Sequence, residues 1–93
     1  MVRKRKTLTT LRSIGPAAAR DLESLGIKWV DELCGHDGQE LYERLCEKTG
    51  VRQDPCVLDV FRCAVAQAEN PNLPAKQKDW WYWSALRKGK KND

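Results

Sequence analysis

Apolar side chains recur at intervals of three and four residues along most of the chain, as they do on the buried face of an α-helix. No segment shows the strict alternation that predicts a half-buried β-strand. The pattern predicts helices over residues 8–12, 16–25, 29–33, 38–48 and 55–69, and a last helix or turn over 76–86. We therefore expect an all-α fold of five or six short helices.

Helix start and stop signals agree with these boundaries. Pro16 and Pro55 stand at first helical positions, where the missing N–H costs nothing. Gly26 and Gly50 follow the ends of predicted helices, where glycine readily adopts the left-handed conformation of a C-terminal cap. These four residues mark two helix starts and two helix ends.

The turn over residues 13–16 carries the strongest functional signal. Gly15 can take backbone dihedral angles that a residue with a Cβ cannot, and Pro16 begins a helix directly after it. The free N–H groups of Ala17 and Ala18 then point outward at the positive end of the helix dipole, which favours a phosphate. The predicted nucleic-acid contacts are Arg12, Ser13, Gly15, Ala17, Ala18, Arg20 and Lys28.

The segment 9–33 resembles a helix-hairpin-helix motif. The matching positions are Ile14, Gly15, Ala19, Leu22, Leu25, Gly26, Ile27, Val30, Glu32 and Leu33. Ser13 stands where the first hairpin glycine is usual, and Trp29 where Ser or Thr usually caps the next helix. The resemblance implies a monovalent cation, K⁺ or Na⁺, held by the main-chain carbonyls of Thr9, Leu11 and Ile14. A hairpin that only packs two helices together is the alternative.

Further segments resemble the small bacterial family of pathogenicity-locus, or mitomycin-resistance-like, helix-hairpin-helix proteins. They are residues 41–46, 54–59, 61–62 and 80–83. The resemblance covers nearly the whole chain apart from its basic ends, and it implies a role in DNA repair, damage resistance or uptake by analogy. A degenerate second hairpin around residues 35–38 is a weaker expectation.

Ninety-three residues predict a single domain. We divide it into a basic arm (1–7), a helix-hairpin-helix segment (8–34), two further helices (35–70), a Trp-rich segment (71–86) and a basic tail (87–93). There is no run of 18 apolar residues and no signal-peptide core, so we expect a cytoplasmic protein without membrane contact.

The net charge of +4 is unevenly distributed. Residues 1–12 carry +5 and residues 86–93 carry +3, which leaves −4 on residues 13–85. Attraction to nucleic acid would therefore come mainly from the two ends. The alternative is that the basic ends only keep the protein soluble.

The four cysteines do not form a zinc-finger pattern, since no two of them are separated by only two residues. Cys46 and Cys63 are expected to be buried as small apolar side chains, whereas Cys34 and His36 leave a metal site open as an alternative. Cys56 lies in the first turn of a helix, where the dipole favours a reactive thiolate. A thiol redox function is therefore a further alternative.

Residues 80–83 form a dense aromatic cluster. Four cations stand beside it in the sequence: Lys76, Lys78, Arg87 and Lys88. Such a cluster can close the core of a small domain, or it can stack the bases of a single strand. We favour the core for Trp80 and Trp83, which are three residues apart, and assign Trp81 and Tyr82 to a partner surface.

The sequence contains no catalytic triad, phosphate-binding loop or dinucleotide fingerprint, so we expect neither an enzyme nor an organic cofactor. We expect non-sequence-specific DNA binding through the hairpin. The alternatives are a protein-interaction adaptor that docks on a larger enzyme, and a thiol redox protein that uses Cys56.

Overall fold

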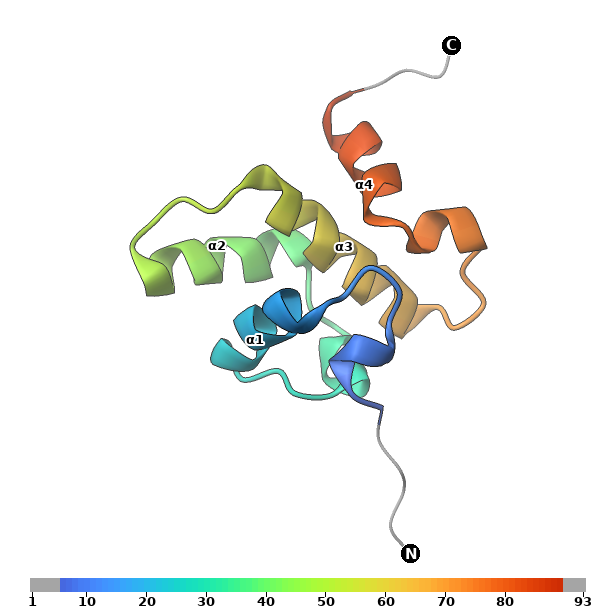
Figure 1. Cartoon of the computed structure of the whole chain (residues 1–93), viewed down its shortest axis with the longest axis horizontal. Helices are drawn as coiled ribbons and strands as arrows, with labels where there is room; N and C mark the ends of the chain where they lie inside the picture. Colours follow the sequence, from blue (N-terminus) through green and yellow to red (C-terminus); the bar gives the residue numbers. More distant parts are fainter. Residues whose placement is uncertain (1–5, 90–93) are drawn as a thin grey trace, which may run out of the picture.

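The computed structural model describes residues 6–89, which fold into helices and turns with no strand in that range (Figure 1). This part of the chain forms four α-helices and three short 3-10 helices, written η. In chain order they are η1 (Leu8–Thr10), α1 (Pro16–Ser24), η2 (Val30–Leu33), α2 (Gly38–Thr49), α3 (Pro55–Glu69), η3 (Ala75–Lys78) and α4 (Trp80–Arg87). The all-α prediction is confirmed.

The number of α-helices is smaller than the five or six expected. The segments 8–12 and 29–33 are the 3-10 helices η1 and η2, because so few residues cannot offset the cost of nucleating an α-helix. The prediction of a helix over 55–69 is confirmed at both ends. Within the described residues, no helix has the length and apolar character that a bilayer crossing requires.

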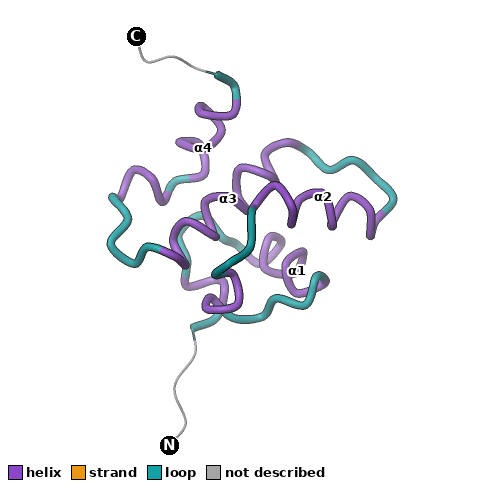
Figure 2. The backbone as a smooth tube through the Cα atoms, turned by 180° about the vertical axis from the view of Figure 1, so that it is seen from behind, coloured by secondary structure: helices purple, strands orange, loops and turns teal. Residues whose placement is uncertain are grey.

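Helix α3 is the element around which the others pack. It lies between α2 and α4 in both views (Figures 1 and 2), and α1, η2 and η3 also contact it. Phe61, near its middle, is completely buried. The buried core consists of Leu8, Ile14, Ala19, Leu22, Ile27, Leu33, Leu41, Tyr42, Leu45, Leu58, Phe61, Cys63, Ala64 and Val65.

The tryptophans stand outside this core. Trp80 and Trp83 are only half-buried, and Trp81 is 59% exposed. The indole Nε1 of Trp83 donates to the Gln77 carbonyl at 2.8 Å. The prediction that Trp80 and Trp83 close the core is therefore wrong: leucines and Phe61 fill it, and these two indoles stay half-buried outside it.

Helix α2 lies tightly against α3 at its first residue, Gly38. A Cβ on Gly38 would lie 2.6 Å from the Cγ of Arg62 and 2.8 Å from its Cα. Side-chain atoms can move aside, but the backbone of a packed helix cannot. The crossing of α2 and α3 therefore requires glycine at this position.

Helix α1 ends in a Schellman turn, as its glycine predicts. Gly26 has a φ of +92° and donates its N–H to the Glu23 carbonyl at 2.9 Å. Ile27 donates to the Leu22 carbonyl at 3.0 Å, and both of these side chains are buried. The chain therefore folds back onto the core directly after α1.

A buried ion pair attaches α4 to α3. Asp59 is completely buried, and Arg87 donates to it from Nε at 2.9 Å and from Nη2 at 3.0 Å. Hydrogen bonding to this carboxylate raises the pKa of Arg87. Arg87 was expected in a basic tail, but it ends α4 and neutralises a buried charge.

We expect Arg87→Met to lower the free energy of unfolding by about 3 kcal/mol, because it leaves the buried Asp59 carboxylate without its partner. Lys88→Met, at the next and exposed position, is the matched control and should change stability by less than about 0.5 kcal/mol. Urea unfolding followed by tryptophan fluorescence measures both. Equal losses in the two variants would contradict a stabilising role for the pair.

Candidate nucleic-acid interface

The predicted hairpin contains a tight turn over residues 11–14. The N–H of Ile14 donates to the Leu11 carbonyl at 3.3 Å, and Ser13 has a φ of +74°. These are the features of a type II turn, whose third residue is usually glycine. The left-handed position therefore falls on Ser13, which stands where a helix-hairpin-helix motif usually has its first glycine.

Gly15 does not use its conformational freedom, contrary to the sequence-based expectation. Its φ of −91° and ψ of −176° are extended angles that any residue adopts, and it stands at the N-cap position of α1 without a capping side chain. A Cβ on Gly15 would meet no atom within 4 Å. Gly15 therefore contributes open space at the helix start rather than an unusual backbone angle.

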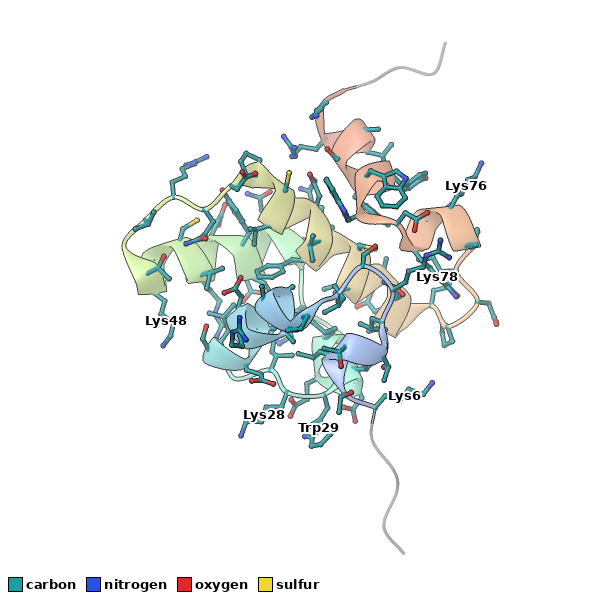
Figure 3. All side chains as sticks on the ribbon, in the orientation of Figure 1. Lys6, Lys28, Trp29, Lys48, Lys76 and Lys78 are labelled. Carbon is teal, nitrogen blue, oxygen red and sulfur yellow. The ribbon has the colours of Figure 1, made fainter. Side chains whose placement is uncertain are left out.

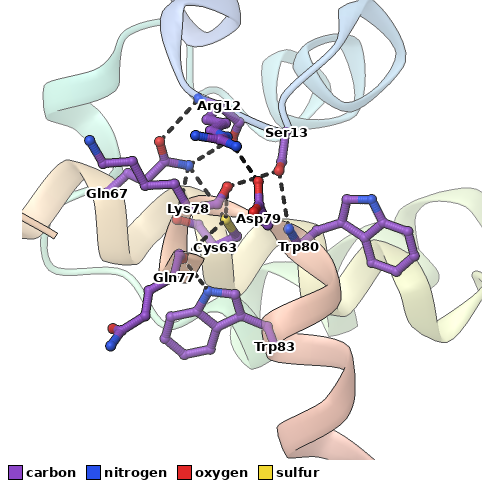
Figure 4. A network of polar contacts seen from close by, with 9 residues as sticks. All are labelled: Arg12, Ser13, Cys63, Gln67, Gln77, Lys78, Asp79, Trp80 and Trp83. Carbon is purple, nitrogen blue, oxygen red and sulfur yellow. Dashed lines mark hydrogen bonds and ion pairs between the residues drawn. The ribbon is translucent and has the colours of Figure 1, made fainter. Parts of the chain in front are cut away.

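The hydroxyl of Ser13 holds the turn against α4. Its Oγ donates to the Lys78 carbonyl at 2.8 Å and accepts the N–H of Trp80 at 3.1 Å (Figure 4). A left-handed backbone costs a residue with a Cβ about 1 kcal/mol, and the two hydrogen bonds offset this cost. The hydroxyl that was predicted to contact nucleic acid is thus engaged within the protein.

Arg12 is held through both its main chain and its side chain. Gln67 accepts the Arg12 N–H at 3.0 Å and donates to the Arg12 carbonyl at 2.7 Å. The Arg12 Nε lies 2.8 Å from a carboxylate oxygen of Asp79, whose side chain is 14% exposed. A phosphate contact by Arg12, as predicted, would compete with this ion pair.

Gln67 and Cys63 complete a network that sequence reasoning missed (Figure 4). The buried Gln67 amide also lies 3.4 Å from the Cys63 carbonyl, and the Cys63 thiol donates to the Lys78 carbonyl at 3.1 Å. Burial raises the pKa of the Cys63 thiol, which keeps it a neutral donor. The sequence offered one signal for this network, namely a polar residue, Gln67, beside the apolar face of the helix over 55–69.

The first turn of α1 presents backbone N–H groups with no acidic residue among them. Gly15 offers no capping side chain, and the first turn contains no Asp or Glu. Ala17 is exposed and Ala18 is half-buried, while Arg20 is exposed one turn further along. The structure therefore brings these four predicted contacts together at one helix start.

Lys28 lies at the opposite end of α1 from this helix start. The nine residues of α1 span about 13 Å, and Lys28 follows the turn at the far end. There it lines a cavity of about 210 Å³ together with Glu23 and Trp29. Figure 3 shows Lys28 on the same edge of the molecule as Trp29 and Lys6. The structure thus separates Lys28 from the other predicted contacts.

The carbonyls expected to hold a monovalent cation belong to Thr9, Leu11 and Ile14. That of Leu11 already accepts the Ile14 N–H, so a cation would share it with the turn. No three His, Cys, Asp or Glu side chains gather as metal ligands within residues 6–89, and the alternative of a Cys34–His36 site gains no support. The carbonyl-bound cation stays a prediction.

The turn of residues 11–14 is repeated 22 positions later, over residues 33–36. The N–H of His36 donates to the Leu33 carbonyl at 3.1 Å, and Gly35 has a φ of +88°. In both copies a 3-10 helix precedes the turn and an α-helix follows it. The expected second hairpin around residues 35–38 thus has a structural counterpart, although a 3-10 helix stands in both copies where a helix-hairpin-helix motif has its first α-helix.

The end of α3 holds both turns. Gln67 binds the main chain of Arg12, and the Glu69 carboxylate accepts the N–H of Gly35 at 2.9 Å. Thr7 and Trp29, which are also 22 positions apart, form an antiparallel bridge between the two copies.

The two helix starts differ in charge. Asp37 caps α2 by accepting the N–H of Gln39 at 3.2 Å, and Glu40 lies in the first turn. These carboxylates repel an anion, whereas the start of α1 has neither a cap nor an acid. Of the two, only the start of α1 is suited to a phosphate.

Comparison with known proteins assigns this chain to a family. The family model described as Pathogenicity locus matches residues 2–89. The chain belongs to the pathogenicity-locus family. It is similar to the mitomycin resistance protein McrB of Streptomyces lavendulae, with 44% identity over 81 residues that make up 87% of this chain and 73% of that protein. No solved structure matches the chain.

Cys56 of this pathogenicity-locus protein is exposed at the start of α3. Asp54 caps the helix by accepting the Cys56 N–H at 2.9 Å. Hydrogen bonding to the Asp54 carboxylate, together with partial desolvation and the carboxylate's charge, raises the pKa of the Cys56 thiol. A reactive thiol needs the opposite shift, so the geometry argues against the redox alternative.

We expect Ser13→Ala to lower the free energy of unfolding by about 2 kcal/mol, because it removes two hydrogen bonds and keeps the left-handed backbone. Ser13→Gly removes the same hydrogen bonds but relieves the backbone, so its loss should be about 1 kcal/mol smaller. Urea denaturation measures both. A loss for Ser13→Gly that equals or exceeds that of Ser13→Ala would show that the turn is not strained at this residue.

We expect iodoacetamide to modify Cys56 more slowly at pH 7 than it modifies free cysteine, because the raised pKa lowers the thiolate fraction. The rate should reach half its maximum at a higher pH than for free cysteine. Asp54→Asn keeps a helix cap without the charge and should accelerate the reaction. Mass spectrometry of tryptic peptides distinguishes Cys56 from the exposed Cys34. A wild-type rate at or above that of free cysteine would restore the redox alternative.

Proposed function

We propose that this protein binds DNA without sequence preference, and that the first turn of α1 contacts the phosphate backbone. The observation that supports the proposal is the exposed helix start at Gly15, which lacks both a capping side chain and an acidic residue. Backbone N–H groups at such a position donate to phosphate oxygens without reading the bases. Gly15, Ala17 and Ala18 supply this contact, and Arg20 adds a charge one turn along.

The cost of leaving α1 uncapped also supports a ligand there. A capping side chain typically stabilises a helix by about 1 kcal/mol, and α2 has one in Asp37. Helix α1 forgoes this stabilisation. A bound phosphate would satisfy the same N–H groups.

Binding is expected to be weak and sensitive to salt. Residues 13–85 carry a net charge of −4, and Arg12 is already paired with Asp79. A single helix start contacts few phosphates, so the basic residues within 1–12 and 86–93 supply much of the remaining attraction.

We also propose that DNA binding serves resistance to damage. The relative named as a mitomycin resistance protein supports a role in resistance. That name bears on the biological role and not on the mechanism, because related folds carry different activities. Protecting or marking damaged DNA is a role that needs no catalysis by this chain.

A protein-interaction adaptor is the second candidate. Two large apolar side chains of the short helix α4 favour it, since Trp81 is 59% exposed and Leu86 is 51% exposed. Such side chains can anchor a protein partner. This candidate would be favoured over the first if the tagged protein purified together with a protein partner and bound no DNA.

We expect Gly15→Asp to weaken binding to a short labelled DNA duplex at low salt by at least about tenfold, because an aspartate cap occupies the free N–H groups and repels phosphate. Protein stability should stay unchanged or rise, since a Cβ fits at this position. Gly15→Ser, a neutral cap, is the matched control and should lose less affinity. Fluorescence anisotropy measures binding, and urea unfolding measures stability.

Two results would count against the proposal. If Gly15→Asp binds the duplex as tightly as the wild type, the start of α1 is not part of the mechanism. If the wild type binds no duplex at low salt, non-specific DNA binding is not the function.

A further inference from the structure

We propose that the aromatic cluster of α4 and the start of α1 form one continuous surface for DNA that ends in unpaired bases, with Trp81 stacking on the first unpaired base. This inference rests on the proposed function. It adds a substrate class, namely a duplex with a single-stranded extension.

The start of α4 is joined directly to the hairpin turn. The N–H of Trp80 donates to the hydroxyl of Ser13 at 3.1 Å, and Asp79 pairs with Arg12 at 2.8 Å (Figure 4). Trp81 is the next residue along α4, so its Cα lies about 3.8 Å from that of Trp80. The aromatic cluster therefore adjoins the segment to which we assign phosphate binding.

Trp81 presents a ring that the protein covers only in part. It is 59% exposed and contacts Trp80 in a T-shaped arrangement, with ring centroids 6.0 Å apart and planes at 78°. An edge-to-face contact combined with this exposure leaves indole surface on which a base can stack. Trp83 is committed elsewhere, because its Nε1 binds the Gln77 carbonyl and its ring packs against Tyr82.

The charge around Trp81 suits a nucleic-acid strand. Residues 75–88 contain four cations and one acid. The acid, Asp79, pairs with Arg12, and one of the cations, Arg87, pairs with the buried Asp59, which leaves Lys76, Lys78 and Lys88. Figure 3 shows Lys76 and Lys78 on η3, directly before α4, and Lys88 follows α4 in the sequence. These lysines flank the exposed Trp81 in the sequence, and lysines combined with exposed aromatic rings are typical of proteins that bind single strands.

The test compares three labelled DNAs: a blunt duplex, the same duplex with a short single-stranded thymidine extension, and the extension strand alone. We expect the full-length wild type to bind the extended duplex about tenfold more tightly than the blunt one, as stacking of one base allows. Trp81→Ala should abolish this preference and leave binding to the blunt duplex unchanged. Trp81→Phe should retain part of the preference.

Leu86→Ala is the matched control, because it removes another exposed apolar side chain from α4. It should retain the whole preference, and circular dichroism should show the same helix content in every variant. Equal wild-type affinity for the two duplexes, or a preference that survives Trp81→Ala, overturns the inference and leaves the proposed function standing. Failure of the wild type to bind any of the three DNAs overturns both.

Discussion

The side-chain amide of Gln67 accepts the N–H of Arg12 and donates to its carbonyl, and the position of the turn before α1 depends on these two bonds. It attaches the turn before α1 to the end of α3, the helix on which the rest of the molecule packs. A buried amide that lost either partner would leave polar groups unsatisfied, so the turn is held in one position. The start of α1 is consequently presented in a single direction.

The same turn also fixes the position of α4. The hydroxyl of Ser13 binds the backbone on both sides of Asp79, and the far end of α4 is fixed to α3 by Arg87 and Asp59. Helix α4 is thus anchored at both ends, although few of its side chains enter the core. A surface composed of the helix start of α1 and the aromatic cluster therefore keeps its shape without a ligand.

Features encoded in neighbouring residues could be predicted from the sequence. Pro55 marked the start of α3, and Gly26 marked the end of α1, because each acts on its own stretch of backbone. Contacts between distant residues could not be predicted: Gln67 meets Arg12 across 55 positions, and Arg87 meets Asp59 across 28. At the candidate site, too, local features could be predicted and long-range contacts could not.

At that site, the amides of Ala17 and Ala18 followed from the local pattern. The engagement of Arg12 and Ser13 by Asp79 and Trp80 depends on where α4 packs.

The bridge between Thr7 and Trp29 joins equivalent positions of the two copies of the repeated segment. The bridge therefore joins the two copies within one polypeptide, so their contact does not depend on protein concentration. Because the two copies have separate coding sequences, substitutions could give the start of α2 an acidic cap and leave the start of α1 without one.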